Sequence, residues 1–106
     1  MTTQITIIGL GQMGGSIGLA LAPHKQTLVR MGHDKRMDVA RAAQAAGAVD
    51  SIHFNLPAAA SNADAVILAL PLNEVRDTLK FIRDDLKEGA VVMDLSPAKR
   101  QVEAWA

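Results

Sequence analysis

The chain has 106 residues, of which 49% are hydrophobic, and it carries 11 Lys plus Arg against 11 Asp plus Glu. This length fits one domain, and the balanced charge provides no basic field that would attract nucleic acid or an acidic membrane surface. The absence of cysteine excludes disulfides, thiolate zinc sites and cysteine nucleophiles, and it is compatible with the reducing cytoplasm, where we expect the protein to act. We find neither a signal-peptide pattern nor an apolar run of about 20 residues that would predict a membrane span.

Short apolar runs alternate with helix-like segments along the chain. Strands are predicted over residues 4–8, 27–32, 49–54, 63–70 and 90–95, and helices over 13–21, 36–46, 57–60, 73–86 and from Ser96 to the C-terminus. Gly47 is expected to end the second helix, Asn73 to cap the fourth, and Pro97 to follow a Ser96 cap. The alternation predicts a doubly wound parallel α/β sheet of Rossmann type, with about five strands in the order 3-2-1-4-5, spanning residues 1–106 as one domain.

The first predicted strand runs into a glycine-rich turn that fits G-x-G-x-x-G, namely Gly9-Leu10-Gly11-Gln12-Met13-Gly14. The pattern is weak alone, but here it follows a strand and opens a helix, as in dinucleotide-binding folds. Gly9 would permit the tight turn, Gly11 the close approach of backbone N–H groups to a pyrophosphate, and Gly14 the contact of helix with strand. Gly15 and Gly18 would let the same helix approach a neighbour. The alternative is a tight turn without a ligand.

Asp34 stands at the end of the second predicted strand, about 20 residues past Gly14. An acid at this place hydrogen-bonds the adenosine ribose of NAD and would repel the 2′-phosphate of NADP, whereas the adjacent Lys35 and Arg36 would tolerate that phosphate. NAD is therefore the predicted cofactor, with NADP left open. The alternatives for Asp34 are a helix cap and a solvated turn.

Two further segments follow predicted strands at the same edge of the sheet, where open α/β sheets bind ligands. Leu70-Pro71-Leu72 either forms a wall beside the cofactor or simply ends a strand. Lys99 lies in the first turn of the last predicted helix, where a cation opposes the helix dipole, so a role near an anion or carbonyl competes with a solvated lysine. His24, His33 and His53 show no metal-ligand or general-base spacing, and no metal site is predicted.

Five segments together resemble the N-terminal nucleotide-binding domain of prephenate and arogenate dehydrogenases: ITIIGLGQMGGSIGLAL, GHD, AGAVD, ADAVILALPLNEV and LKEGAVVMDLSPAK. The resemblance implies NAD(P)-dependent oxidative decarboxylation in tyrosine biosynthesis, with hydride transfer from the substrate ring to the nicotinamide. It places the turn of residues 9–14 at the pyrophosphate, Asp34 at the ribose and residues 70–73 along the cofactor. Lys35 joins these as a cofactor-binding candidate.

The chain departs from that family in two ways. The family pattern D-x-x-S-x-K has its serine near the substrate hydroxyl, but Pro97 stands at that position here and Ser96 precedes it. Ser96 and Lys99 are thus the catalytic candidates. The family's catalytic histidine and helical dimerisation domain follow this segment, and we expect neither within the 106 residues, so the chain alone should be catalytically incomplete.

Partners expected from the sequence are a dinucleotide, a small-molecule substrate in a longer parent enzyme, and a second copy of the chain in a homodimer. The enzyme-class alternatives are the cofactor domains of 3-hydroxyisobutyrate dehydrogenases and pyrroline-carboxylate reductases. The non-enzymatic alternative is a regulatory module that senses dinucleotides, for which Trp105 offers a fluorescence probe.

Overall fold

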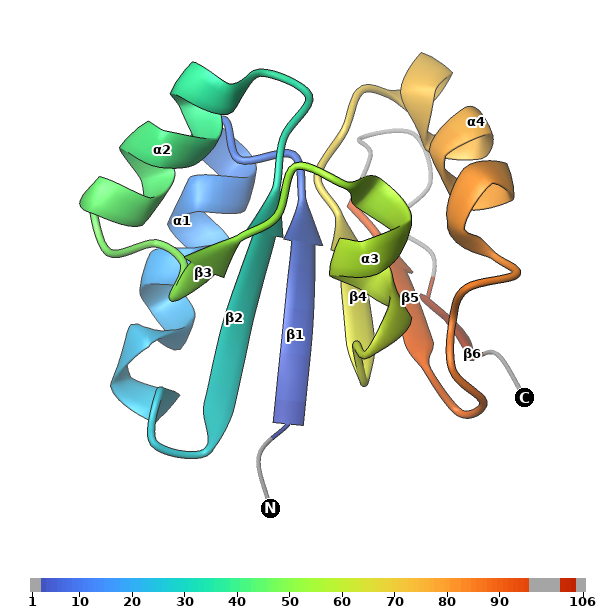
Figure 1. Cartoon of the computed structure of the whole chain (residues 1–106), viewed down its shortest axis with the longest axis horizontal. Helices are drawn as coiled ribbons and strands as arrows, with labels where there is room; N and C mark the ends of the chain where they lie inside the picture. Colours follow the sequence, from blue (N-terminus) through green and yellow to red (C-terminus); the bar gives the residue numbers. More distant parts are fainter. Residues whose placement is uncertain (1–2, 96–101, 105–106) are drawn as a thin grey trace.

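The computed structural model describes residues 3–95 and 102–104. Over these residues the chain forms one sheet with helices on both faces (Figure 1). The strands are β1 (Thr3–Ile8), β2 (Leu28–His33), β3 (Ser51–Ile52), β4 (Ala65–Leu68), β5 (Val91–Asp94) and β6 (Val102–Ala104). The helices are α1 (Gln12–Leu21), a 3-10 turn η1 (Ala22–His24), α2 (Met37–Ala45), α3 (Leu56–Ser61) and α4 (Leu72–Ile82). None of these helices has the length and apolar character needed to cross a bilayer.

The strand order is β3-β2-β1-β4-β5-β6, and β1 to β5 run parallel. The predicted doubly wound sheet with the order 3-2-1-4-5 is therefore confirmed. At the end of β1, Ile8 pairs with His33 of β2 on one side and with Leu68 of β4 on the other. The chain winds outward in opposite directions on the two sides of β1, and such a switch point is where open α/β sheets bind ligands.

The two faces of the sheet carry separate apolar cores, because successive strand residues point to opposite faces. Ile7 and Ile67 pack with Ala40 and Ala43 under α1 and α2. Ile8 and Leu68, one residue further along each strand, pack on the opposite face against α3 and α4. Burial on both faces explains why these strands are apolar without alternation.

Several element boundaries differ from the sequence prediction. The strands β3 and β4 are shorter than expected, and α4 begins at Leu72 and ends at Ile82. Asn73 was the wrong choice of cap, because Pro71 takes the N-cap position with extended backbone and its carbonyl accepts the N–H of Glu74 at 2.9 Å. Gly47 ends α2 with φ +83°, as predicted.

The prediction of a last helix reaching the C-terminus is wrong over residues 102–104, which form β6 antiparallel to β5. Strand β5 would otherwise expose a row of unpaired backbone groups at the sheet edge, and a returning strand satisfies them. The predicted start of that helix, Ser96 and Pro97, lies outside the described residues.

Candidate functional site

The glycine turn after β1 is shaped by its contact with the next strand. Gly9 has φ +94°, which side chains rarely adopt, and a Cβ there would overlap the carbonyl oxygen of Ala69. The N–H of Gly9 donates to the carbonyl of His33 at 2.8 Å, which continues the β1–β2 ladder into the turn. A residue other than glycine is therefore excluded both by backbone conformation and by space.

Two further glycines set the position of α1, and two others on the same segment do not. A Cβ at Gly14 would overlap the carbonyl oxygen of Gly9, and one at Gly18 would overlap that of Ala48, so both allow the close packing predicted for them. A Cβ at Gly15 would meet only Leu10 O, at 3.8 Å, so Gly15 is not needed for close packing against a neighbouring element. Gly11 differs from all of these, because no atom lies within 4 Å of its Cβ position.

Gly11 is also the N-cap of α1, and no side chain in the described part of the chain caps this helix. The first backbone N–H groups of a helix lack intrahelical partners and attract anions. Open space at Gly11, beside uncapped N–H groups, fits the close approach of a pyrophosphate.

Asp34 ties the turn to the end of β2. Its Oδ2 accepts the N–H of Leu10 at 2.8 Å, and its Oδ1 accepts the N–H of Arg36 at 2.9 Å. Arg36, and not Asp34, occupies the N-cap position of α2. Because a carboxylate has about four lone-pair sites, these two bonds orient Asp34 and leave further acceptor capacity toward a ligand.

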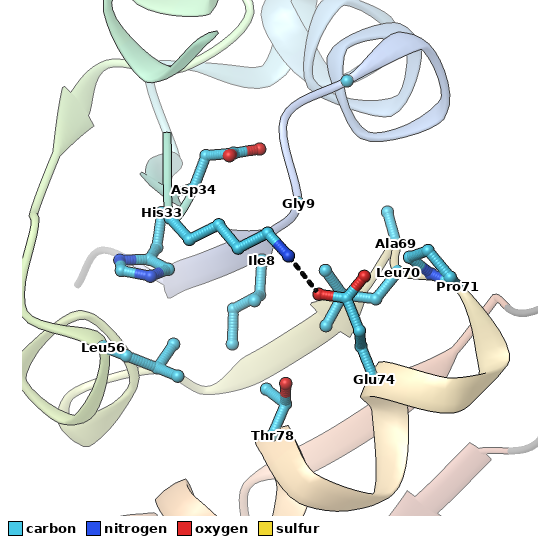
Figure 2. Close-up of a pocket in the computed structure, with 12 residues that line it drawn as sticks. Ile8, Gly9, His33, Asp34, Leu56, Ala69, Leu70, Pro71, Glu74 and Thr78 are labelled. Carbon is cyan, nitrogen blue, oxygen red and sulfur yellow. Dashed lines mark hydrogen bonds and ion pairs between the residues drawn. The ribbon is translucent and has the colours of Figure 1, made fainter. Parts of the chain in front are cut away.

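A pocket of about 280 Å³ opens between the ends of β1, β2 and β4 and the first two turns of α4. Figure 2 shows His33 and Asp34 on one side of it and Glu74 and Thr78 on the other, with Ile8 between them. Leu56, at the start of α3, also lines the pocket and lies below His33 in Figure 2. This combination of apolar surface and a few polar groups is typical of small-molecule sites.

The structure brings together some of the predicted cofactor-binding residues. Those lining the pocket are Gly9, Gly11, Asp34, Lys35, Leu70 and Pro71. Those that do not line it are Leu10, Gln12, Met13, Gly14 and Leu72. Leu10 is buried in the core under α1 and α2, and Met13 and Leu72 are about half exposed. The catalytic candidates Ser96 and Lys99 lie outside the described residues.

Sequence reasoning missed three polar residues of the pocket. His33, given no role from its spacing, is 8% exposed, and its Nδ1 lies 2.8 Å from the carbonyl of His53. Since a carbonyl only accepts, Nδ1 is the donor, and the remaining ring nitrogen is Nε2. Glu74 and Thr78 line the opposite wall four residues apart on α4, a spacing that places both on one helix face. That spacing was visible in the sequence.

Charge at the pocket comes from Asp34, Lys35 and Glu74. Lys35 Nζ lies 3.0 Å from Glu74 Oε1, an ion pair drawn as the dashed line in Figure 2. Among the described residues, no group of three or more His, Cys, Asp or Glu side chains is placed to hold a metal ion.

The proteins that this chain resembles are nucleotide-dependent oxidoreductases, in agreement with the geometry of this pocket. A family model described as "NADP oxidoreductase coenzyme F420-dependent" matches residues 4–98. Prephenate dehydrogenase from Lactococcus lactis subsp. cremoris (strain MG1363) is 36% identical over 100 residues, which are 93% of this chain and 28% of that protein.

Two solved structures extend the comparison. Prephenate dehydrogenase from A. aeolicus, in complex with hydroxyphenyl propionate and NAD+, matches with a TM-score of 0.82 at 25% identity, over 91% of this chain and 34% of that one. Mycobacterium tuberculosis 3-hydroxyisobutyrate dehydrogenase matches with a TM-score of 0.77 at 31% identity, over 91% of this chain and 32% of that one. The chain thus spans about a third or less of the relatives that it matches, and the resemblance to prephenate dehydrogenases is confirmed. This chain belongs to the family described as NADP oxidoreductase coenzyme F420-dependent, and it is an NAD(P)-binding oxidoreductase domain.

Proposed function

We propose that this chain binds NAD, more tightly than NADP, as the cofactor domain of a prephenate dehydrogenase-like oxidoreductase in cytoplasmic tyrosine biosynthesis. The observation that carries the proposal is the joining of Asp34 to the glycine turn, with Asp34 Oδ2 accepting the N–H of Leu10 at 2.8 Å beside the pocket. One carboxylate thereby lies next to both the phosphate-binding turn and the adenosine side of the pocket.

Each part of the site has a distinct task in this proposal. The N–H groups that open α1 beside Gly11 hold the pyrophosphate, and the free acceptor sites of Asp34 take the ribose hydroxyls. Leu70 and Pro71, at the end of β4, form an apolar wall along the cofactor. The nicotinamide of a bound cofactor supplies the hydride acceptor, while these residues bind and orient it.

Oxidation of prephenate or arogenate also needs a substrate pocket and a base, which a cofactor domain does not supply. We therefore propose that catalysis requires a second domain, and that Ser96 and Lys99 act at the substrate side. The isolated 106-residue chain should not turn over prephenate in the presence of NAD+. Turnover by this chain would refute the proposal of a separate catalytic domain.

Calorimetric titration of the chain with NAD+ and NADP+ tests the proposed cofactor site. Asp34→Ala should weaken NAD+ binding by at least about tenfold, because it removes a charged acceptor from the ribose. Asp38→Ala is the matched control, since Asp38 is an exposed acid on α2 whose carboxylate pairs with Arg36 and does not line the pocket. Equal affinities of wild type and Asp34→Ala, or no binding of either nucleotide to the wild type, would contradict the proposal.

A second candidate, the cofactor domain of a 3-hydroxyisobutyrate dehydrogenase-like enzyme, is supported by the 31% identity to the M. tuberculosis structure. Both candidates share the cofactor site, so nucleotide binding does not separate them. A screen of prephenate, arogenate and 3-hydroxyisobutyrate on the complete gene product that contains this chain would do so. Oxidation of 3-hydroxyisobutyrate alone would favour the second candidate.

A further inference from the structure

An ion pair crosses the pocket at the adenosine side. Lys35 follows the end of β2, Glu74 lies in the first turn of α4, and their charged groups are 3.0 Å apart. Both residues line the pocket, although 39 positions separate them in the sequence. The Lys35 side chain is 75% exposed and that of Glu74 is 31% exposed, so the pair is accessible to a ligand and to salt.

Lys35 is the one Lys or Arg that lines this pocket within the described residues. The neighbouring cation, Arg36, is held at 2.9 Å by Asp38 on the exposed start of α2, and its side chain is not part of the pocket wall. A phosphate on the ribose next to Asp34 would therefore meet two carboxylates, Asp34 and Glu74, and a single ammonium that is already paired. A phosphate binds more tightly beside a free cation and less tightly beside carboxylates.

We propose that Glu74 is a specificity-determining residue that disfavours NADP by holding the Lys35 ammonium away from a 2′-phosphate. This inference rests on the proposed function, because it places the adenosine ribose at Asp34. Glu74 acts in two ways: it competes with the phosphate for Lys35, and it repels the phosphate directly. Neither effect changes the affinity for NAD, because its 2′-hydroxyl carries no charge. Cofactor choice thus depends on α4 as well as on the residues that follow β2.

Glu74→Gln tests the proposal, because it keeps the shape of the side chain and removes only its charge. We expect NADP+ to bind about three- to tenfold more tightly to this variant, and NAD+ to change by less than about twofold. Lys35→Gln should do the opposite and weaken NADP+ more than NAD+. Asp77→Asn is the matched control, because Asp77 is an exposed acid on the same helix that does not line the pocket.

Two fragments isolate the phosphate effect: adenosine 2′,5′-bisphosphate, which carries the 2′-phosphate, and 5′-AMP, which lacks it. The gain of Glu74→Gln should appear with the first and shrink as salt rises from 0.05 M to 0.5 M, since exposed charges are screened over about 10 Å at 0.1 M. Thermal unfolding and circular dichroism confirm that each variant is folded before titration.

The outcomes separate this inference from the proposed function. If the wild type binds neither NAD+ nor NADP+, the proposed function fails and the inference fails with it. If NAD+ binds and depends on Asp34, but Glu74→Gln leaves the ratio of the NAD+ and NADP+ affinities unchanged, only the inference fails. Equal tightening of both nucleotides would show that the ion pair merely blocks the pocket, and this too would overturn a role in cofactor choice.

Discussion

Two aspartates of this fold, Asp34 and Asp50, receive backbone N–H groups in similar ways but differ in their other partners. Asp34 accepts only backbone N–H groups, those of Leu10 and Arg36, among the described residues. Asp50 accepts the backbone N–H of Arg30 at 2.9 Å and also two bonds from its guanidinium, at 3.2 and 3.0 Å.

Arg30 connects Asp50 to the ends of two helices. Its side chain is 4% exposed, and Nη1 donates to the carbonyls of Gly18, Gly47 and Ala48 at 2.8, 2.7 and 3.1 Å. The end of α1 and the end of α2 are thereby fixed to β2. A carboxylate engaged by a buried guanidinium stabilises the fold, whereas one held by backbone alone keeps acceptor sites for a ligand. The partners of an acid thus indicate its role better than its position at a strand end.

The largest expected effects come from two glycines of α1. Gly14 packs on the glycine turn that Asp34 holds through Leu10, and Gly18 accepts from Arg30, which also binds Asp50. Gly14→Ala would press a Cβ into the carbonyl of Gly9, and Gly18→Ala into that of Ala48. Each should lower the free energy of unfolding by about 3 kcal/mol, because the backbone must move. Only Gly14→Ala should also abolish NAD+ binding at temperatures where the variant is folded. Urea unfolding and calorimetry measure the two quantities.

Gly15→Ala is the control for both variants. Gly15 lies inside α1, and a Cβ there would make only an ordinary contact with Leu10 O at 3.8 Å, so alanine should stabilise the chain by up to about 1 kcal/mol. If Gly18→Ala abolished NAD+ binding as fully as Gly14→Ala, the division between a ligand-binding end and a stabilising end of α1 would be wrong.

The parts of this fold that depend on local sequence were predictable. The glycine turn, Asp34 at the end of β2 and the left-handed Gly47 follow from patterns a few residues long. The strand order follows from the regular alternation of strands and helices along the chain. Asn73 was misplaced as a cap because Pro71, two residues earlier, fits the extended conformation that a cap requires. Local preferences compete over such short distances, and boundaries shift accordingly.

The parts that depend on convergence of distant segments were not predictable. Arg30 was expected only as a residue of the second strand, because its carbonyl partners on α1 and after α2 meet it only in the folded chain. The Lys35–Glu74 pair joins residues 39 positions apart. Strand β6 arises from pairing with β5, an interaction that has no signature in residues 102–104 themselves.

A smaller effect is expected from Asp50→Asn, which removes the charge that faces Arg30. Breaking a buried pair typically costs about 3–5 kcal/mol. The Asp50 side chain is 33% exposed and three carbonyls still hold the guanidinium, so we expect about 1–2 kcal/mol. NAD+ affinity should not change. Asp38→Asn is the control, since its pair with Arg36 is exposed on both sides and should contribute little. Weakened NAD+ binding in Asp50→Asn would contradict the division of roles in which Asp50 stabilises the fold and Asp34 binds the ligand.

The smallest predicted effect concerns the acid dependence of stability. Hydrogen bonds from the Arg30 side chain hold the pKa of the Asp50 carboxyl below its ordinary value. A depressed pKa means that the charged carboxylate stabilises the fold above the unfolded pKa of about 3.9, and that this contribution is lost as pH falls through the folded value. The difference in free energy of unfolding between wild type and Asp50→Asn should therefore be full at pH 7 and shrink toward zero below about pH 4.

Asp64, whose pKa is lowered by hydrogen bonds from Lys87 and from the backbone of Gln4, titrates equally in both proteins and cancels in this difference. Urea unfolding of wild type and Asp50→Asn at several pH values between 2.5 and 7 measures this difference in free energy of unfolding, provided that both proteins unfold in two states. A gap that stayed constant with pH would mean that asparagine disturbs packing and not charge. The contact of Asp50 with Arg30 would then stabilise the fold through packing and not through charge, and a guanidinium partner would not by itself mark a stabilising carboxylate.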